Sequence, residues 1–200
     1  MTLMTDFRAL AGQSSVRVIA KAALSLVMVG IAAFFSREAF VLAIIIIFTG
    51  VTGPAIRLIT MKRDGTYDRI LVSPVSKPRF FLEFAGLWTI AVLLPLVPAT
   101  AVVMLYDGPV TLLAVITGTV LATVSGTLAG FVSRGLSDAH LAALALSGLL
   151  IVLTVIRTPA AAFLPFAALS FPPSDPAALP ALAILPAVAA VLLAAAVSRS

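Results

Sequence analysis

The sequence contains no cysteine and only one histidine, His140. The absence of cysteine excludes a disulfide framework and a thiolate metal site, and a single imidazole supplies too few ligands for a histidine metal site. No G-x-x-x-x-G-K-[ST] loop is present, so the chain has no familiar means of hydrolysing ATP itself. No run of Lys and Arg alternates with aromatic residues, which argues against nucleic acid as a partner. We therefore expect no cofactor bound by this chain.

Charge is also scarce, because only 10% of the 200 residues are charged whereas 62% are hydrophobic. A soluble domain carries about 25% charged residues, and so few charges could not cover a water-exposed surface. The composition therefore predicts an all-α integral membrane protein in contact with the lipid bilayer. Six apolar stretches have the length of membrane-spanning helices, which need about 20 residues each. These are residues 18–35, 39–60, 84–106, 110–132, 139–156 and 178–197.

Two further segments carry apolar residues but are not predicted to be spans. Residues 1–17 place apolar side chains at near-helical spacing among basic ones, which predicts an amphipathic helix in the membrane interface; the alternative is a frayed polar terminus. Residues 158–177 are rich in proline yet largely apolar, which predicts re-entrant half-helices at the outer boundary. An ordinary loop buried against the bundle is the alternative there. Within the second span, Gly50, Gly53 and Pro54 predict a weakened or kinked second half.

The distribution of basic residues predicts the orientation. Of the 13 Lys and Arg residues, an inside N-terminus leaves only Arg37 and Arg157 on the outer side. Basic residues favour the cytoplasmic side, so both termini are expected in the cytoplasm of a plasma-membrane protein. Lys21 is expected to extend to the headgroups from the start of its span. The middle of each predicted span then holds no charge, which argues against a proton-coupled carrier.

Residues 61–83 form the one long polar stretch between predicted spans. Gly65 permits a break after the second span, Thr66 is a candidate N-cap for a short helix, and Asp68 in its first turn suits the helix dipole. Pro74 ends that helix, and Ser76 is a candidate cap for the next one. The pattern predicts a short helix beneath the membrane, followed by the third span.

One face of this short helix is apolar. Tyr67, Ile70 and Leu71 share a face by their i, i+3, i+4 spacing, while the charged residues face the cytoplasm. Such a helix has the right shape to dock into the groove of a partner protein. The alternative is a solvated connector whose charges only fix the topology.

The same segment resembles the cytoplasmic loop of type-2 ABC exporter permeases. Asp64-Gly65-Thr66, Ile70-Leu71 and Ser73-Pro74-Val75-Ser76 match the pattern of that family, although aspartate stands where glutamate is frequent and Tyr67 where leucine is common. The length is similar to that of compact members such as haem-exporter-like permeases. The resemblance implies that this segment is a coupling helix, docked on a separate ATPase subunit that binds ATP and Mg²⁺. It also implies a dimer with a second permease copy or a homologue, and an apolar or amphipathic cargo.

The coupling residues that the resemblance implies are Arg63, Asp64, Gly65, Thr66, Tyr67, Asp68, Arg69, Ile70, Leu71, Ser73 and Pro74.

Small residues recur every four positions on the fourth span, at Gly118, Ala122, Gly126 and Gly130. This stripe predicts the close approach of another helix. The neighbour is either a helix of the same chain or, alternatively, a dimer partner; lining of a transport pathway is a third possibility.

Two other classes of function are alternatives to a transporter subunit, which is not itself an enzyme. A lipid-modifying membrane enzyme needs clustered acid, base or metal-ligating groups, and Asp64, Asp68 and His140 are the only loose cytoplasmic candidates. A non-catalytic scaffold or channel is the other alternative.

Overall fold

The computed structural model describes residues 15–33, 38–72, 76–108, 110–155, 165–170 and 182–198. Regular secondary structure in these residues is entirely helical, in agreement with the predicted all-α class. The principal helices are α2 (Ser15–Ala33), α3 (Glu38–Arg63), α4 (Thr66–Leu71), α5 (Lys77–Asp107), α6 (Val110–Val132), α7 (Leu136–Val155), α8 (Pro165–Ser170) and α9 (Ile184–Ser198).

Four of the described helices, α3, α5, α6 and α7, are long and apolar enough to cross a membrane. Their outward faces carry large apolar side chains such as Leu94, Val97, Leu149 and Val152, each more than half exposed. Surfaces of this kind are stable against lipid and not against water. The chain is therefore a membrane-embedded helical protein.

The remaining two predicted spans correspond to α2 and α9, which are not among these four. Arg17 and Lys21 lie in the first two turns of α2. The described part of α9 has 15 residues, which covers about 22 Å at 1.5 Å per residue. That is shorter than the roughly 30 Å hydrocarbon core, whereas the sequence places the start of this span earlier, at residues outside the described part.

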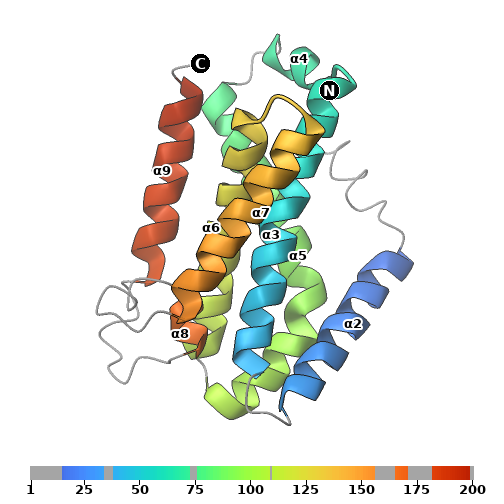
Figure 1. Ribbon diagram of the computed structural model, residues 1–200, viewed down its shortest axis with the longest axis vertical. Coiled ribbons are helices and arrows are strands. Elements are labelled where there is room, and N and C mark those ends of the chain that lie inside the picture. Colours follow the sequence, from blue (N-terminus) through green and yellow to red (C-terminus); the bar gives the residue numbers. More distant parts are fainter. Residues whose placement is uncertain are drawn as a thin grey trace.

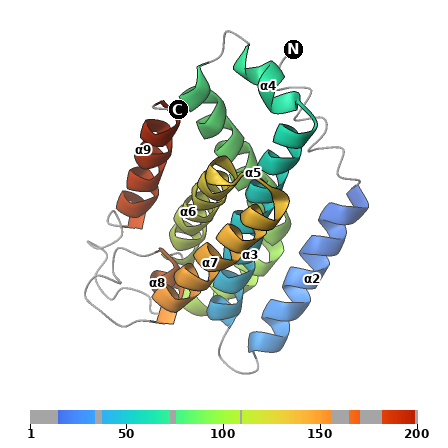
Figure 2. The ribbon, with the colours of Figure 1, turned by 45° about the horizontal axis from the view of Figure 1, so that its top comes forward.

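Helices α3 and α6 form the most extensive contact and lie at the centre of the bundle. Figures 1 and 2 show α5, α7, α2 and α9 arranged around them, with α4 across one end and α8 near the other. Helix α3 is continuous through Gly50, Gly53 and Pro54, so no break occurs where the sequence predicted weakening. The two glycines instead permit close packing, because an added Cβ would lie 2.7 Å from Ala122 Cβ at Gly50 and 2.7 Å from the Trp88 ring at Gly53.

The small-residue stripe of α6 packs inside the same chain. A Cβ at Gly126 would overlap the carbonyl oxygen of Val51, and one at Gly130 would lie 2.8 Å from the carbonyl oxygen of Ala55. These contacts join α6 to α3. At Gly118 the neighbour is Phe166 of α8, whose ring would lie 2.8 Å from an added Cβ.

The threonines of α6 also form hydrogen bonds within the bundle. Thr119, Thr123 and Thr127 are fully buried, and each hydroxyl donates to the carbonyl oxygen four residues earlier. The Thr123 hydroxyl also lies 2.8 Å from that of Thr89, which ties α6 to α5. These hydroxyls are satisfied by the bundle.

Residues 1–14 of the predicted interfacial helix lie outside the described residues, as does most of the predicted re-entrant segment 158–177. The described part of that segment is α8, in which Phe166, Ala167 and Leu169 are each 2% exposed. Helix α8 packs against α6 and α7. Its apolar side chains are therefore buried in protein.

Candidate functional site

Helix α4 connects the end of α3 to the start of α5 and lies across the end of the bundle (Figure 1). Most of the described Lys and Arg residues are found at or near this end, because α3 and α6 end here and α5 and α7 begin here. We call this the basic end of the bundle. The described residues of the predicted coupling segment, Arg63 to Leu71, all lie at the basic end, while Ser73 and Pro74 lie outside the described residues.

The turn before α4 is built by Asp64, Gly65 and Thr66. Asp64 completes α3, since its backbone N–H donates to the carbonyl oxygen of Thr60 at 3.0 Å. Gly65 has a φ of 72°, the left-handed region that glycine adopts without strain. The Thr66 N–H then donates to Asp64 Oδ1 at 3.0 Å. The sequence predicted Thr66 as the N-cap, but Gly65 occupies that position, and the Asp64 carboxylate supplies the acceptor that Gly65 lacks.

The charge of Asp64 is favoured by this arrangement. Hydrogen bonds from Thr66 hold the pKa of the fully exposed Asp64 carboxyl below its usual range, and Arg57 and Arg69 lower it further. A carboxylate that accepts backbone N–H bonds is stabilised in its ionised form. The turn is therefore anchored by a negative charge at physiological pH.

The inner face of α4 packs against an aromatic cluster made by two helices, α5 and α6. The Tyr67 ring packs edge-on against Phe81 of α5 with centroids 6.2 Å apart, and Phe81 packs against Phe131 of α6 at 5.1 Å. Phe81 is fully buried. Ile70 packs against the same cluster, as the predicted i, i+3 face requires. Burial raises the pKa of the Tyr67 phenol, with a smaller contribution from Asp68.

Lys62 joins α3 to the end of α6 next to this cluster. Its Nζ donates to the carbonyl oxygens of Gly130 at 3.0 Å, Phe131 at 2.7 Å and Ser133 at 3.1 Å. The last carbonyls of a helix lack partners within the helix, so the ammonium group acts as the C-terminal cap of α6. It also lies 5.8 Å from the centroid of Tyr67 and 5.7 Å from that of Phe131. Sequence reasoning assigned Lys62 only to the cytoplasmic charge, because nothing near it in the sequence indicates α6.

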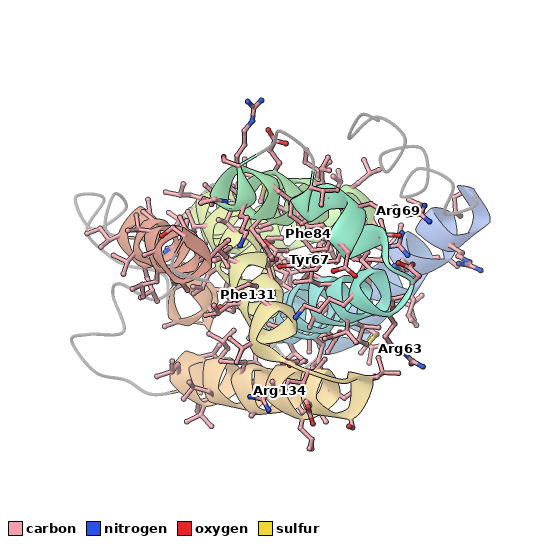
Figure 3. All side chains as sticks on the ribbon, turned by 90° about the horizontal axis from the view of Figure 1, so that it is seen from above. Arg63, Tyr67, Arg69, Phe84, Phe131 and Arg134 are labelled. Atoms are coloured by element: carbon pink, nitrogen blue, oxygen red, sulfur yellow. The ribbon has the colours of Figure 1, made fainter. Side chains whose placement is uncertain are left out.

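The outer face of α4 is charged and exposed. Arg63, Asp64, Asp68 and Arg69 are all exposed, and they place both signs of charge within one short segment. Viewed onto the basic end, Tyr67, Phe84 and Phe131 lie toward the middle, whereas Arg63, Arg69 and Arg134 lie around the rim (Figure 3). The segment thus has an apolar inner face fixed to the bundle and a polar outer face open to a partner.

The stripe residues Gly118, Ala122, Gly126 and Gly130 are not part of this site. All four are buried along α6 against α3 and α8. The stripe is thus filled by helices of the same chain.

The possible catalytic groups are dispersed among the described residues. His140 is exposed, and its Nδ1 lies 2.9 Å from the carbonyl oxygen of Leu136 in its own helix. Glu83 pairs with Arg79 at 2.7 Å across one helical turn. No three His, Cys, Asp or Glu side chains of the described segments come close enough to hold a metal ion.

No protein-family model, curated protein or solved structure matches this chain.

Proposed function

We propose that this chain is the membrane-spanning permease subunit of an ABC exporter, and that a separate ATPase subunit docks on α4. The observation that carries the proposal is the two-faced character of α4. Its outer face exposes Asp68 and Arg69, while its inner face places Tyr67 and Ile70 in a cluster shared by the bundle helices. A segment built this way can bind a partner and pass a displacement into the bundle.

The route into the bundle is short and made of packed side chains. A force on α4 reaches α5 through Tyr67 and Phe81, and then α6 through Phe131. Lys62 connects α3 to the same end of α6 through three hydrogen bonds. Densely packed groups transmit displacement because they have little free space in which to deform. Closure of an ATP-bound partner would therefore move three helices together.

The charges of α4 favour a partner with a mixed, complementary surface. Arg63 and Asp64 adjoin each other at the end of α3, and Asp68 and Arg69 adjoin each other in α4. Charges of both signs at an interface contribute to specificity and register more than to affinity. The groove that receives α4 should carry acidic and basic residues in matching positions.

The same proposal includes a topology finer than the four membrane-crossing helices. Here α2 and α9 are the first and last of six spans, and the basic end of the bundle faces the cytoplasm. Basic residues are retained on the cytoplasmic side. Helix α9 ends near the basic end, and α2 begins beside the middle of α3 and runs away from the basic end (Figure 1). Both termini are then cytoplasmic in the plasma membrane. A second permease copy or a homologue completes the transport pathway, with its interface on a face other than the filled α6 stripe.

The decisive experiment is purification of the chain from native membranes, followed by a test for a co-purifying ABC ATPase subunit. We expect the ATPase to co-purify, and its activity to depend on α4. Replacing Asp64–Asp68 with a Gly/Ser linker should abolish both, as should the paired charge reversal Asp68→Lys and Arg69→Glu. Both of the latter side chains are exposed, so the reversal leaves the bundle core intact.

Arg134→Gln is the matched control, because Arg134 is also exposed at the basic end but lies in the α6–α7 connection. It should leave ATPase binding unchanged. The proposal fails if the linker variant still binds the ATPase subunit and supports transport.

A further inference from the structure

A pocket of about 280 Å³ opens between α2, α3 and α5. It lies beyond the coupling segment, in the apolar part of the bundle. Helix α2 contributes Lys21, Leu24, Ser25 and Met28, and Trp88 and Val92 of α5 are among the residues on the opposite wall. Leu24 is 61% exposed and Met28 is 43% exposed, so the pocket is continuous with the outer, lipid-facing surface.

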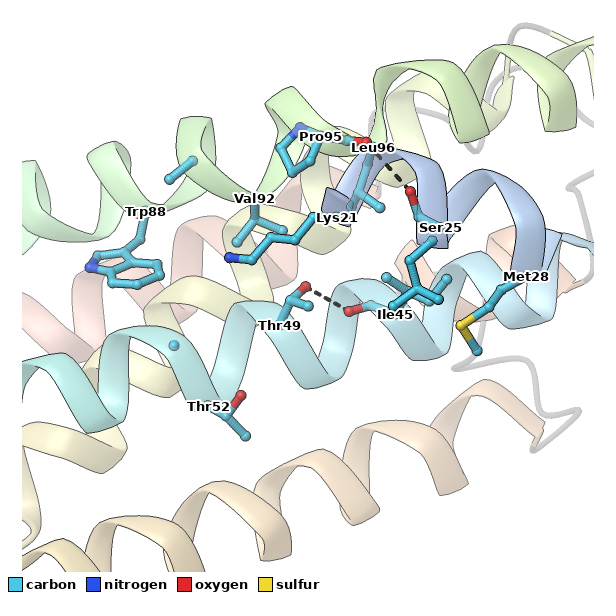
Figure 4. A pocket seen from close by; sticks show the side chains of 13 residues that line it. Lys21, Ser25, Met28, Ile45, Thr49, Thr52, Trp88, Val92, Pro95 and Leu96 are labelled. Atoms are coloured by element: carbon cyan, nitrogen blue, oxygen red, sulfur yellow. Dashed lines mark hydrogen bonds between the residues drawn. The ribbon is translucent and has the colours of Figure 1, made fainter. Parts of the chain in front are cut away.

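Lys21 lies about halfway along the length of the bundle. The pocket places it with Thr49 and Thr52, which flank the middle of α3 (Glu38–Arg63). Figure 4 shows its ammonium group between Val92 and Thr49, pointing along the pocket toward Trp88. The sequence predicted that Lys21 would reach the headgroups and that mid-membrane zones would hold no charge. The structure differs because α2 is shorter than α3, so its first turns lie beside the middle of α3 (Figure 1).

Lys21 is the one charged residue among those that line the pocket. The Arg79–Glu83 ion pair involves other groups, and within the described residues no carboxylate pairs with Lys21. A cation at mid-depth of a membrane protein is costly without a partner and typically marks a functional site. An anion in the pocket would supply that partner.

The hydroxyl groups on the wall have already used their protons. Ser25 donates to the carbonyl oxygens of Ala22 and Pro95, Thr49 donates to that of Ile45, and Thr52 donates to that of Phe48. The ammonium of Lys21 therefore has protons left to donate, as does the buried indole N–H of Trp88, which has no hydrogen-bond partner within the described residues. The lining fits a ligand that accepts hydrogen bonds from a cation and is otherwise apolar.

We propose that this pocket binds an amphiphile with an anionic head, a carboxylate or a phosphate, on an apolar chain. The head would pair with Lys21, and the chain would follow the apolar wall out past Leu24 and Met28. A volume of about 280 Å³ is near the lower limit of about 300 Å³ for small-molecule pockets. It therefore holds the head and the first part of a chain, and the remainder lies in lipid. This site is independent of whether an ATPase docks on α4.

Trp88 makes the proposal directly measurable, because it is the single tryptophan of the chain and lines the pocket. Bromine atoms quench tryptophan fluorescence on contact. The full chain is reconstituted into phosphatidylcholine vesicles at pH 8 and titrated with two matched pairs of brominated probes. The first pair is dibromostearate against dibromostearyl alcohol; the second is brominated phosphatidylglycerol against brominated phosphatidylcholine.

We expect the anionic member of a pair to quench saturably. Its half-saturating concentration should be at least about tenfold lower than that of its matched neutral or zwitterionic probe, because a charge-assisted hydrogen bond contributes a factor of that size. The pair that responds distinguishes a free fatty acid from a phospholipid headgroup. Lys21→Gln should raise the half-saturating concentration about tenfold, and Lys21→Arg should preserve it.

Arg17→Gln is the matched control, since it removes one positive charge from an exposed position one turn earlier on α2, outside the pocket. It should leave the half-saturating concentration unchanged. Equal quenching within both probe pairs overturns the proposal. So does an anion preference that survives in Lys21→Gln, or an equal effect of Lys21→Gln and Arg17→Gln.

Discussion

The ammonium group of Lys62, in the last turn of α3, lies 2.7 Å from the carbonyl oxygen of Phe131 at the end of α6. The same group reaches the carbonyls of Gly130 and Ser133. The Lys62 side chain thus caps the C-terminus of a helix that is distant in the sequence. The contact holds the end of α3, which leads into α4, against the end of α6.

We expect Lys62→Met to destabilise the protein by about 1–3 kcal/mol, because the buried end carbonyls of α6 lose a charged donor. The shift is measured as a lower midpoint of thermal unfolding in detergent micelles. Lys77→Met is the control, since Lys77 is at the start of α5, where it has no hydrogen bond or ion pair within the described residues. Equal midpoints for the two variants would contradict a capping role for Lys62.

The close approach of α3 and α6 predicts opposite outcomes for two glycine substitutions. Gly126→Ala places a methyl group onto the Val51 backbone, and the helices can relieve that overlap only by separating. Overpacking of this kind typically costs about 1–3 kcal/mol. Gly148→Ala, in α7, meets nothing within 4 Å, and alanine favours a helix over glycine by about 1 kcal/mol.

The folded yield and the unfolding midpoint of the two glycine variants test this directly. The folded yield and unfolding midpoint of Gly126→Ala should be lower than those of the parent protein. Those of Gly148→Ala should equal or exceed the parent values. Loss of stability in both would indicate that the packing of α6 on α3 is not the cause.

The anchoring of α4 is tested by Tyr67→Ala, compared with Tyr106→Ala at the far end of α5. Tyr67 is half-buried against Phe81, whereas Tyr106 is 67% exposed. An aromatic pair contributes about 0.5–1.5 kcal/mol beyond its buried area. Tyr67→Ala should therefore accelerate amide hydrogen exchange in α4, at Arg69 and Val72, while α6 keeps its protection.

Tyr106→Ala should leave exchange in α4 unchanged. If Tyr67→Ala gave parent-like exchange there, α4 would be held by its connections to α3 and α5 and not by its inner face.

The hydrogen bonds of Asp64 predict that the stability of the turn before α4 depends on pH. Hydrogen bonds from Thr66 lower the folded-state pKa of Asp64, so this group stabilises the folded turn above the ordinary aspartate pKa of about 3.9. The contribution is lost as pH falls from that value through the lowered folded-state pKa. An NMR titration of the Thr66 amide in micelles should give a midpoint below about 3.9. Asp64→Asn should show no such step, and a midpoint at or above the ordinary value would refute the hydrogen bond.

The sequence predicted the helices best where local punctuation marks their ends. The predicted spans 84–106 and 110–132 place their boundary close to that between α5 and α6, where Gly108 adopts a φ of 79°. The inward face of Tyr67 and Ile70 followed from helical spacing alone. Ser76, the predicted cap, is the N-cap of α5. The predicted span begins later, at residue 84, because apolarity indicates membrane depth and not where a helix begins.

Contacts between distant helices could not be predicted in this way. The hydrogen bonds of Lys62 to Gly130 and Phe131 join positions far apart in the sequence, and no local pattern indicates which helix end a lysine will reach. The position of Lys21 was missed for a related reason, since its depth depends on the offset of α2 against α3. Hydropathy along the chain does not contain that offset.

The close fit of α6 against α3 also has a consequence for how the chain is made. Helix α3 leaves the ribosome before α6, and the atoms that fill its small-residue face, around Gly50, Val51 and Ala55, come from α6. A nascent chain that ends before Val110 therefore holds α3 in the membrane with that face uncovered. Biogenesis of this protein thus includes an interval in which the α6-facing side of α3 is uncovered, and in that interval an insertion chaperone or a premature partner could bind it.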